Sequence, residues 1–227
     1  MILAVTGLER ERRLLAGPGV EAIAGGGDHA RLEAVLDRLA ASMDGIISIG
    51  IAGGLAPGLP VGRWVVASAV HDGRQARPTD PDWSAWLASR LPQAERGLVL
   101  GVDAVVALAA QKAELHRTSG ALAVDMESHV AARIAVRHRL PFVAARVISD
   151  AAHRTLPPAA RVGMRRDGRV DLPAVLRSLF AKPGQLPALI RTGLEAERGF
   201  RALLGGHRRL GAGLGGPDVG KLPRDMV

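Results

Sequence analysis

The chain contains no cysteine and no tyrosine, and aromatic residues make up only 3% of its 227 positions. The absence of cysteine excludes disulfides and thiolate metal sites, which suits a reducing compartment. The scarcity of aromatic rings argues against a platform on which single-stranded nucleic acid would stack. No uncharged apolar run reaches about 18 residues, so we expect no transmembrane helix. The first residues also lack the basic and then apolar pattern of a signal peptide, and we expect a cytoplasmic protein.

Charge of one sign is concentrated at one end of the chain. Residues 1–152 hold 16 basic and 16 acidic side chains, whereas residues 153–227 hold 14 basic and 6 acidic ones. The whole net charge of +8 therefore lies in the last third, while a hydrophobic content of 48% indicates a folded chain. We expect a domain over residues 1–182, followed over residues 183–227 by a basic amphipathic helical extension and an irregular tail.

Short β-branched runs alternate with longer amphipathic stretches along the first two thirds. This alternation predicts an α/β fold around a buried, mainly parallel or mixed sheet. We expect strands at residues 2–5, 20–24, 46–51, 64–70, 98–102, 122–124 and 142–148, and helices at 9–16, 28–42 and from about 126 onward. After residue 150 we expect a loop at 153–158, helices at 172–181 and 186–204, and irregular chain over 205–227.

Four stretches lie at the ends of these predicted strands, where open α/β sheets place their sites. They are TGLERE at 6–11, GIAGGL at 50–55, AVDMES at 123–128 and ARVISD at 145–150. The glycines of the second stretch let a ligand approach the backbone. Two acids of the third flank a methionine, and the arginine of the fourth needs a partner if it is buried. Each stretch alone also fits an ordinary role as a helix start, a tight turn or a helix cap.

The order and spacing of the four motifs resemble the superfamily of purine nucleoside phosphorylases and methylthioadenosine/S-adenosylhomocysteine nucleosidases. The resemblance covers roughly residues 1–152 and the helix that should close the domain. It implies a central twisted mixed β-sheet flanked by helices, here with a helical C-terminal extension. It also implies an enzyme that cleaves an N-glycosidic bond and releases a base, without a cofactor or a metal and with phosphate as a candidate co-substrate.

The resemblance assigns roles by motif position. Glu11 resembles the carboxylate that activates the attacking water, and Asp150 resembles the acid that protonates N7 of a departing purine. Glu127 resembles the carboxylate that accepts the ribose hydroxyls. The chemistry agrees, because negative charge stabilises an oxocarbenium-like ribosyl centre and a general acid is worth about 10²–10⁴ in rate. The other implied substrate-binding positions are Met126, Arg146, Ser149, Ala52, Gly53 and Val105.

Three departures from the family pattern affect the acceptor and the substrate. Related phosphorylases hold phosphate with an arginine and a serine where this chain has Ser48 and Ile51, which favours water slightly. Nearby cationic side chains keep phosphate open as an acceptor: Arg10, Arg12, Arg13, His29 and Arg31. Val105 stands where relatives carry a phenylalanine against the base. The chain before Gly25 has room for one strand only, and the loss of a hairpin would open the 5′ side of the sugar or the dimer contact.

These features resemble the bacterial hopanoid-associated phosphorylases, whose implied substrate is adenosylhopane, an adenosine joined at its 5′ carbon to a triterpenoid. The alternative within the class is a soluble nucleoside such as methylthioadenosine, S-adenosylhomocysteine or adenosine. A nucleic-acid-binding role, suggested by the basic composition, is disfavoured by the acid-rich motifs. We expect a homodimer that takes a small-molecule or lipid-linked purine nucleoside.

The C-terminal extension carries an apolar stripe at helical spacing beside several arginines. The stripe consists of Leu186, Leu189, Ile190, Leu194, Phe200, Leu203 and Leu204. A basic amphipathic helix of this kind can lie on an anionic surface, which would place the enzyme at the inner membrane. The alternative, slightly favoured by the behaviour of amphipathic helices in soluble proteins, is that the stripe packs on the domain or on a second subunit.

Overall fold

A computed structural model describes residues 1–162 and 168–216. Its centre is an eight-stranded sheet in the order β2-β1-β3-β7-β6-β4-β5, with β8 paired to both β3 and β4. The strands are β1 (Ile2–Thr6), β2 (Val20–Ala24), β3 (Gly45–Gly54), β4 (Trp64–His71), β5 (Ala76–Pro78), β6 (Glu95–Gly101), β7 (Ala123–Asp125) and β8 (Phe142–Asp150). Pairs such as β1–β3 and β3–β8 are parallel, whereas β3–β7 and β4–β8 are antiparallel. The expected mixed sheet is therefore confirmed.

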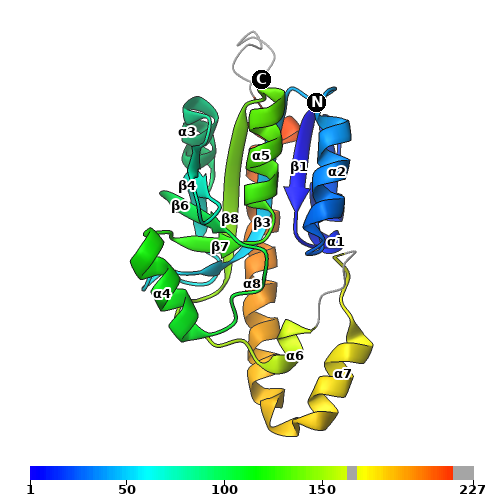
Figure 1. Ribbon diagram of the computed structural model, residues 1–227, viewed down its shortest axis with the longest axis vertical. Helices are drawn as coiled ribbons and strands as arrows, with labels where there is room; N and C mark the ends of the chain where they lie inside the picture. Colours follow the sequence, from blue (N-terminus) through cyan, green and yellow to red (C-terminus); the bar gives the residue numbers. More distant parts are fainter. Residues whose placement is uncertain (163–167, 217–227) are drawn as a thin grey trace.

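Helices cover both faces of this sheet (Figure 1). They are α1 (Glu9–Leu15), α2 (His29–Ala40), α3 (Pro81–Arg90), α4 (Ala109–Ser119), α5 (Ser128–His138), α6 (Pro158–Arg161), α7 (Leu172–Ala181) and α8 (Leu186–Leu210), with 3₁₀ turns η1 (Pro183–Gln185) and η2 (Ala212–Gly215). Strand β5 and helices α3 and α4 were not predicted from the sequence, and the predicted loop at 153–158 ends where α6 begins.

Alternation along the strands creates two separate cores. Leu3 and Val5 of β1 pack in one cluster with residues of α2 and α5. Ile2 and Ala4 point to the opposite face and pack in a second cluster with residues of α3 and α8. Successive side chains of a strand point to opposite faces, so a strand covered on both sides is apolar throughout. The central strand β8 shows this fully, because all nine of its residues are buried.

The second part of α8 belongs to this core. Leu203 and Leu210 are buried on the sheet, and Gly206 lies so close to Trp64 that an added Cβ would be 2.3 Å from the indole. The adjacent glycines 205 and 206 had suggested irregular chain, but the helix continues to Leu210. That expectation is wrong for residues 205–210, because glycine here permits close helix packing. Residues 217–227 of the expected irregular tail lie outside the described residues.

The first part of α8 and the whole of α7 project from the body as a helical hairpin (Figure 1). We call residues 172–194 the arm. None of the α7 residues is buried. The apolar side chains that the arm exposes are Leu172, Leu176, Phe180, Leu186, Ile190 and Leu194. The predicted stripe is thus divided between a part packed on the body and a part exposed on the arm. None of the helices in the described ranges is long and apolar enough to cross a membrane.

Candidate active site

Glu11 is fully buried at the first turn of α1, where backbone N–H groups converge on its carboxylate. Its Oε2 accepts hydrogen bonds from the amides of Gly7 at 2.9 Å and Leu8 at 2.7 Å. Its Oε1 accepts one from the amide of Ile51 at 2.6 Å, which ties α1 to β3. A Cβ at Gly50 would lie 2.6 Å from Oε1, so only glycine fits beside this carboxylate. The glycine motif of β3 therefore serves Glu11.

The electrostatics of Glu11 suit a base. Burial raises its pKa, and the three backbone donors together with the charge of Arg146 oppose that rise without cancelling it. Burial disfavours the charged form of a carboxyl group, which makes the carboxylate a better proton acceptor. Oε1 accepts one protein hydrogen bond and so retains a lone pair for a further donor, such as a water molecule.

Arg146 of β8 is fully buried and finds its partner in Asp125 of β7, with which it forms an ion pair. Its guanidinium also donates to Ser48 and, at 3.1 Å, to Ser128 Oγ. Ser128 Oγ in turn donates to Asp125 at 2.6 Å. Within the described residues, Arg146 Nη1 and Asp125 Oδ1 are buried without a hydrogen-bond partner. These two atoms can serve a bound water or substrate.

Glu127 is buried where the turns after β1 and β2 meet the start of α5. A Cβ at Gly25 would lie 2.8 Å from Glu127 Cγ, so the chain needs glycine there. Burial raises the pKa of Glu127 to about 8, helped by the negative charges of Asp125 and Glu11 and opposed by Arg146. The carboxyl groups of Asp125, Glu11 and Glu127 thus lie around one buried cation, Arg146, and the raised pKa of Glu127 favours its protonated form.

Asp150 ends β8 on the other side of the site. Its Oδ1 accepts a hydrogen bond from Ser149 Oγ at 2.8 Å, and the same hydroxyl lies 3.1 Å from the carbonyl of Ala52. Its Oδ2 forms an ion pair with Lys112, which also donates to the carbonyl of Ala151 at 3.2 Å. The structure therefore brings three of the predicted positions together. It adds Lys112, which the sequence analysis missed.

Strand β3 connects the two sides of the site. Gly50 lies against Glu11, and an added Cβ at Gly53 would be 3.5 Å from Asp150 Oδ2. Two residues of β3, Ile51 and Ala52, lie between these glycines, so their Cα atoms are about 10 Å apart. The candidate base and the candidate acid therefore face the same strand end about one nucleoside length apart.

The remaining predicted positions differ in exposure. Met126 is partly buried just beyond the end of β7, between the two acids of its motif. Val105 lies in the loop after β6, and its side chain is 40% exposed, which makes it the one exposed member of the predicted set. The single strand β2 between α1 and Gly25 confirms that the chain has room for only one strand there.

The cations that could have held phosphate are mostly engaged elsewhere. Arg10 pairs with Glu197 at 2.7 Å, while Arg12 and Arg13 both pair with Glu9 at 2.7 and 3.0 Å. Carboxylates that neutralise these guanidiniums compete with any anion. These three guanidiniums are therefore not free for phosphate, whereas that of Arg31 donates to the carbonyl of Ala24 at 2.9 Å.

One group among the described residues has the composition of a metal site. Ligand atoms of His29, Asp103 and His129 all lie within 4.8 Å of one another. Asp103 Oδ1 is 3.0 Å from His129 Nε2 and 3.6 Å from His29 Nδ1. Burial lowers the pKa of His129, which favours the neutral form that binds metals. Asp103 thus lies beside both imidazoles, while His29 Nε2 and His129 Nδ1 are buried without a hydrogen-bond partner within the described residues.

The family model of the phosphorylase superfamily matches residues 26–180, which is more than half of the chain. The chain therefore belongs to the phosphorylase superfamily. This confirms the family expected from the four motifs, and with it an enzyme of the nucleosidase and nucleoside phosphorylase class.

Solved structures share the fold at low sequence identity. A 5′-methylthioadenosine/S-adenosylhomocysteine nucleosidase from S. pneumoniae, with a transition-state inhibitor, is 18% identical and has a TM-score of 0.60, with 92% of this chain and 100% of that chain covered. The Neisseria meningitidis nucleosidase of the same description is 19% identical and has a TM-score of 0.59, with 91% of this chain and 96% of that chain covered. Futalosine hydrolase of Helicobacter pylori strain 26695 is 16% identical and has a TM-score of 0.56, with 90% of this chain and 97% of that chain covered. These likenesses confirm the predicted fold class.

Proposed function

We propose that the protein cleaves the N-glycosidic bond of a 5′-substituted adenosine and releases adenine. The observation that carries the proposal is the placement of Glu11 and Asp150 against Gly50 and Gly53 of one strand. A nucleoside lying along the end of β3 would meet a base at its sugar and an acid at its purine. The similar structures of nucleosidases that act on such adenosines support the same reading.

The site supplies what the reaction needs. As the bond to the purine breaks, positive charge develops on the ribosyl carbon. The buried acids Glu11 and Asp125 would supply negative charge near it, since both lie close enough to Glu127 to raise its pKa. Glu127 would accept or donate to the ribose hydroxyls, and Met126 would pack on the sugar. Asp150, oriented by Ser149, would place a proton on N7, because a purine leaves poorly as an anion.

Water is the acceptor that the geometry favours. The Ile51 amide already donates to Glu11, so it is not free to donate to an anion, whereas the Ser48 hydroxyl accepts from Arg146. A water on Glu11 Oε1 would give up its proton to the carboxylate while its oxygen attacks the ribosyl carbon. Arg146 Nη1, which lacks a partner within the described ranges, could hold the same water.

The test is turnover of 5′-methylthioadenosine in phosphate-free buffer made with ¹⁸O-water. We expect adenine and a ribose product that carries the label, and Glu11→Gln should nearly abolish both. The matched control is Glu9→Gln, which changes a neighbouring acid whose partners are Arg12 and Arg13. Strict dependence on added phosphate, with a ribosyl 1-phosphate product, would overturn the choice of water.

The natural substrate that we favour is a lipid-linked adenosine of the adenosylhopane kind, with a soluble nucleoside as the alternative. Val105 offers no aromatic face to the base, and the single strand β2 leaves the sugar's 5′ side less covered than a hairpin would. A large 5′ substituent needs such an opening. Comparing kcat/KM for 5′-methylthioadenosine with that for an adenosine carrying a long 5′-alkyl chain tests this choice. Preference for the short substituent would favour the soluble class.

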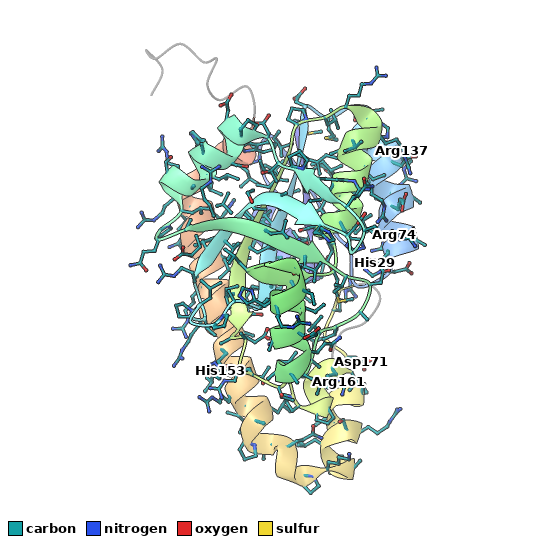
Figure 2. All side chains as sticks on the ribbon, turned by 60° about the vertical axis from the view of Figure 1, so that its left-hand side comes forward. His29, Arg74, Arg137, His153, Arg161 and Asp171 are labelled. Carbon is teal, nitrogen blue, oxygen red and sulfur yellow. The ribbon has the colours of Figure 1, made fainter. Side chains whose placement is uncertain are left out.

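The arm supports a peripheral contact with an anionic membrane. Residues 172–194 contain three basic side chains, Arg177, Lys182 and Arg191, and no acidic one. Phe180 is 84% exposed and Leu172 63% exposed. The amide of Glu9 donates to the carbonyl of Gly168 at 3.0 Å, so the chain reaches the arm beside the candidate site. Asp171, which directly precedes the arm, is labelled in Figure 2. A membrane that contacts the arm would therefore lie near the candidate site.

Vesicle co-sedimentation tests the membrane contact. We expect the full chain to bind vesicles with anionic lipid and not neutral ones, and Arg177→Glu to weaken binding because each basic residue contributes about 1 kcal/mol near such a surface. Phe180→Ser should weaken it as well. The controls are Arg74→Glu and Val136→Ser, which change a cation and an exposed apolar residue of the body. Equal loss in both sets, or no binding at low salt, would exclude the arm as the contact.

A homodimer, which the family resemblance implies, also belongs to this proposal. The exposed apolar residues Val105 and Leu108 flank the base side of the site and provide a candidate contact for a second copy. Sedimentation equilibrium of the full chain and of Leu108→Asp tests it. A monomer at micromolar concentration would contradict the dimer without affecting the proposed reaction.

A further inference from the structure

Lys112 is buried in a way that helix packing does not explain. It is 0% exposed, and it is the one buried residue of α4. A helix usually docks through an apolar face, whereas α4 presents an ammonium group to Asp150 and to the carbonyl of Ala151. A buried charge is costly unless it is paired. The contact with Asp150 is therefore the reason that Lys112 can be buried.

The hydrogen bonds around Asp150 allow its carboxyl group to hold a proton or to lack one. Ser149 has a single hydroxyl hydrogen but two acceptors within reach, Asp150 Oδ1 at 2.8 Å and the Ala52 carbonyl at 3.1 Å. When Asp150 is ionised, the hydroxyl donates to it. When Asp150 carries a proton, the hydroxyl can turn to Ala52 and accept that proton's hydrogen bond. Neither state leaves a group around Ser149 unsatisfied.

Lys112 can also keep its hydrogen bond with Asp150 whether or not the Asp150 carboxyl group carries a proton. As an ammonium it donates to Asp150 Oδ2, and as a neutral amine it could accept from that oxygen while still donating to Ala151. Arginine could not do this, because a guanidinium does not give up its proton in proteins. The chain uses arginine at 27 of its 30 basic positions and lysine only at 112, 182 and 221. Lysine at a buried position is thus a departure from the usage of this chain.

We propose that Lys112 is a positioning residue that holds Asp150 toward the purine and supplies the proton that Asp150 delivers. The inference rests on the proposed function. Starting from the ion pair, the Lys112 ammonium gives a proton to the Asp150 carboxylate, and the Asp150 carboxyl group gives a proton to N7 as the glycosidic bond breaks and its electron pair goes to N9. Asp150 ends as a carboxylate. The lysine is left as a neutral amine and regains its proton from water after adenine leaves.

The test compares two leaving groups in the same variants. One substrate is 5′-methylthioadenosine, which needs a proton on N7, and the other is the 4-nitrophenyl riboside with the same 5′ group, which leaves as a stable phenolate. Lys112→Met should lower kcat for the adenosine about 10²-fold and leave the nitrophenyl riboside nearly unchanged. Equal losses on both substrates would assign Lys112 a structural role only and overturn the proposal.

Lys112→Arg keeps the ion pair and is the variant expected to stay folded, which thermal unfolding would verify. It should remain slow on 5′-methylthioadenosine, because its guanidinium cannot pass a proton to Asp150. Wild-type turnover of the adenosine by Lys112→Arg would overturn the proton route. The proposed function fails separately, if the wild-type enzyme releases no adenine from any 5′-substituted adenosine.

Discussion

The sheet buries charged side chains, whereas the arm exposes apolar ones. All nine residues of β8 are buried, including Arg146 and Asp150, whereas α7 has no buried residue at all. Residues 1–152 balance 16 basic against 16 acidic side chains, and the arm carries basic side chains alone. Charges inside the sheet are paired because burial is costly otherwise. Apolar groups on the arm stay in water, a state that burial against a partner or a membrane would relieve.

This difference between the two regions indicates that the sheet carries the reaction and the arm carries contacts with other surfaces. Substitutions at the strand ends should change turnover, whereas substitutions on the arm should change where the enzyme binds and leave the chemical step alone. The largest expected effect is at Asp150. Asp150→Asn is nearly isosteric but removes the proton donor, so adenine release should fall by about 10²-fold or more. Steady-state kinetics with 5′-methylthioadenosine measures it.

The arm provides the control for this variant. Phe180→Ser removes the most exposed apolar side chain of α7 and should leave kcat for a soluble substrate unchanged. If both variants lose activity alike, the separation between the two regions is wrong. Near-native turnover in Asp150→Asn would remove Asp150 from the mechanism.

The helix α8 runs through both regions, which allows a comparison within one element. An added Cβ at Gly206 would lie 2.3 Å from Trp64, whereas one at Gly193 meets nothing within 4 Å. Gly206→Ala should lower the free energy of unfolding by about 1–3 kcal/mol through overpacking. Gly193→Ala should raise it or leave it unchanged, by up to about 1 kcal/mol, because alanine favours helix. Urea unfolding of both variants measures the difference, and equal effects would mean that α8 does not rest on the sheet as described.

The same contrast explains what could be predicted from the sequence. The strands of the sheet and α7 carry local signals, and the predicted ranges 20–24 and 172–181 agree with the structure. Helix α4 carries no such signal, because its buried residue is a lysine rather than an apolar face. The prediction for the end of α8 was wrong, because paired glycines usually break a helix, whereas here Gly206 fits against Trp64 and the helix continues.

The motifs placed the acids at the strand ends but not the partners that control them. Arg146 was expected to need a counter-ion, yet nothing local shows that Asp125 supplies it across two strands. Lys112 reaches Asp150 from 38 positions away in the sequence. Such contacts depend on how the strands and α4 assemble, which periodicity does not encode.

The pH dependence of stability also distinguishes the body from the arm, because the buried acid Glu127 lies in the body. Burial and neighbouring acids raise the pKa of Glu127 to about 8, above the ordinary value of 4.5 for a glutamate in water. Between these values the folded chain holds a proton that the unfolded chain has lost, so stability from this group is present at low pH and falls as pH rises. The slope is at most about 1.4 kcal/mol per pH unit.

Glu127→Gln removes this titration, so the stability of the variant relative to the wild type should improve from about pH 5 to about pH 8. Glu11 contributes a fall of the same sign, which the variant retains. Urea unfolding across this range measures the two profiles, with Phe180→Ser expected to keep the wild-type slope. Parallel profiles for the wild type and Glu127→Gln would show that Glu127 is ionised in the folded protein, and its carboxylate would then act only as an acceptor for the ribose hydroxyls.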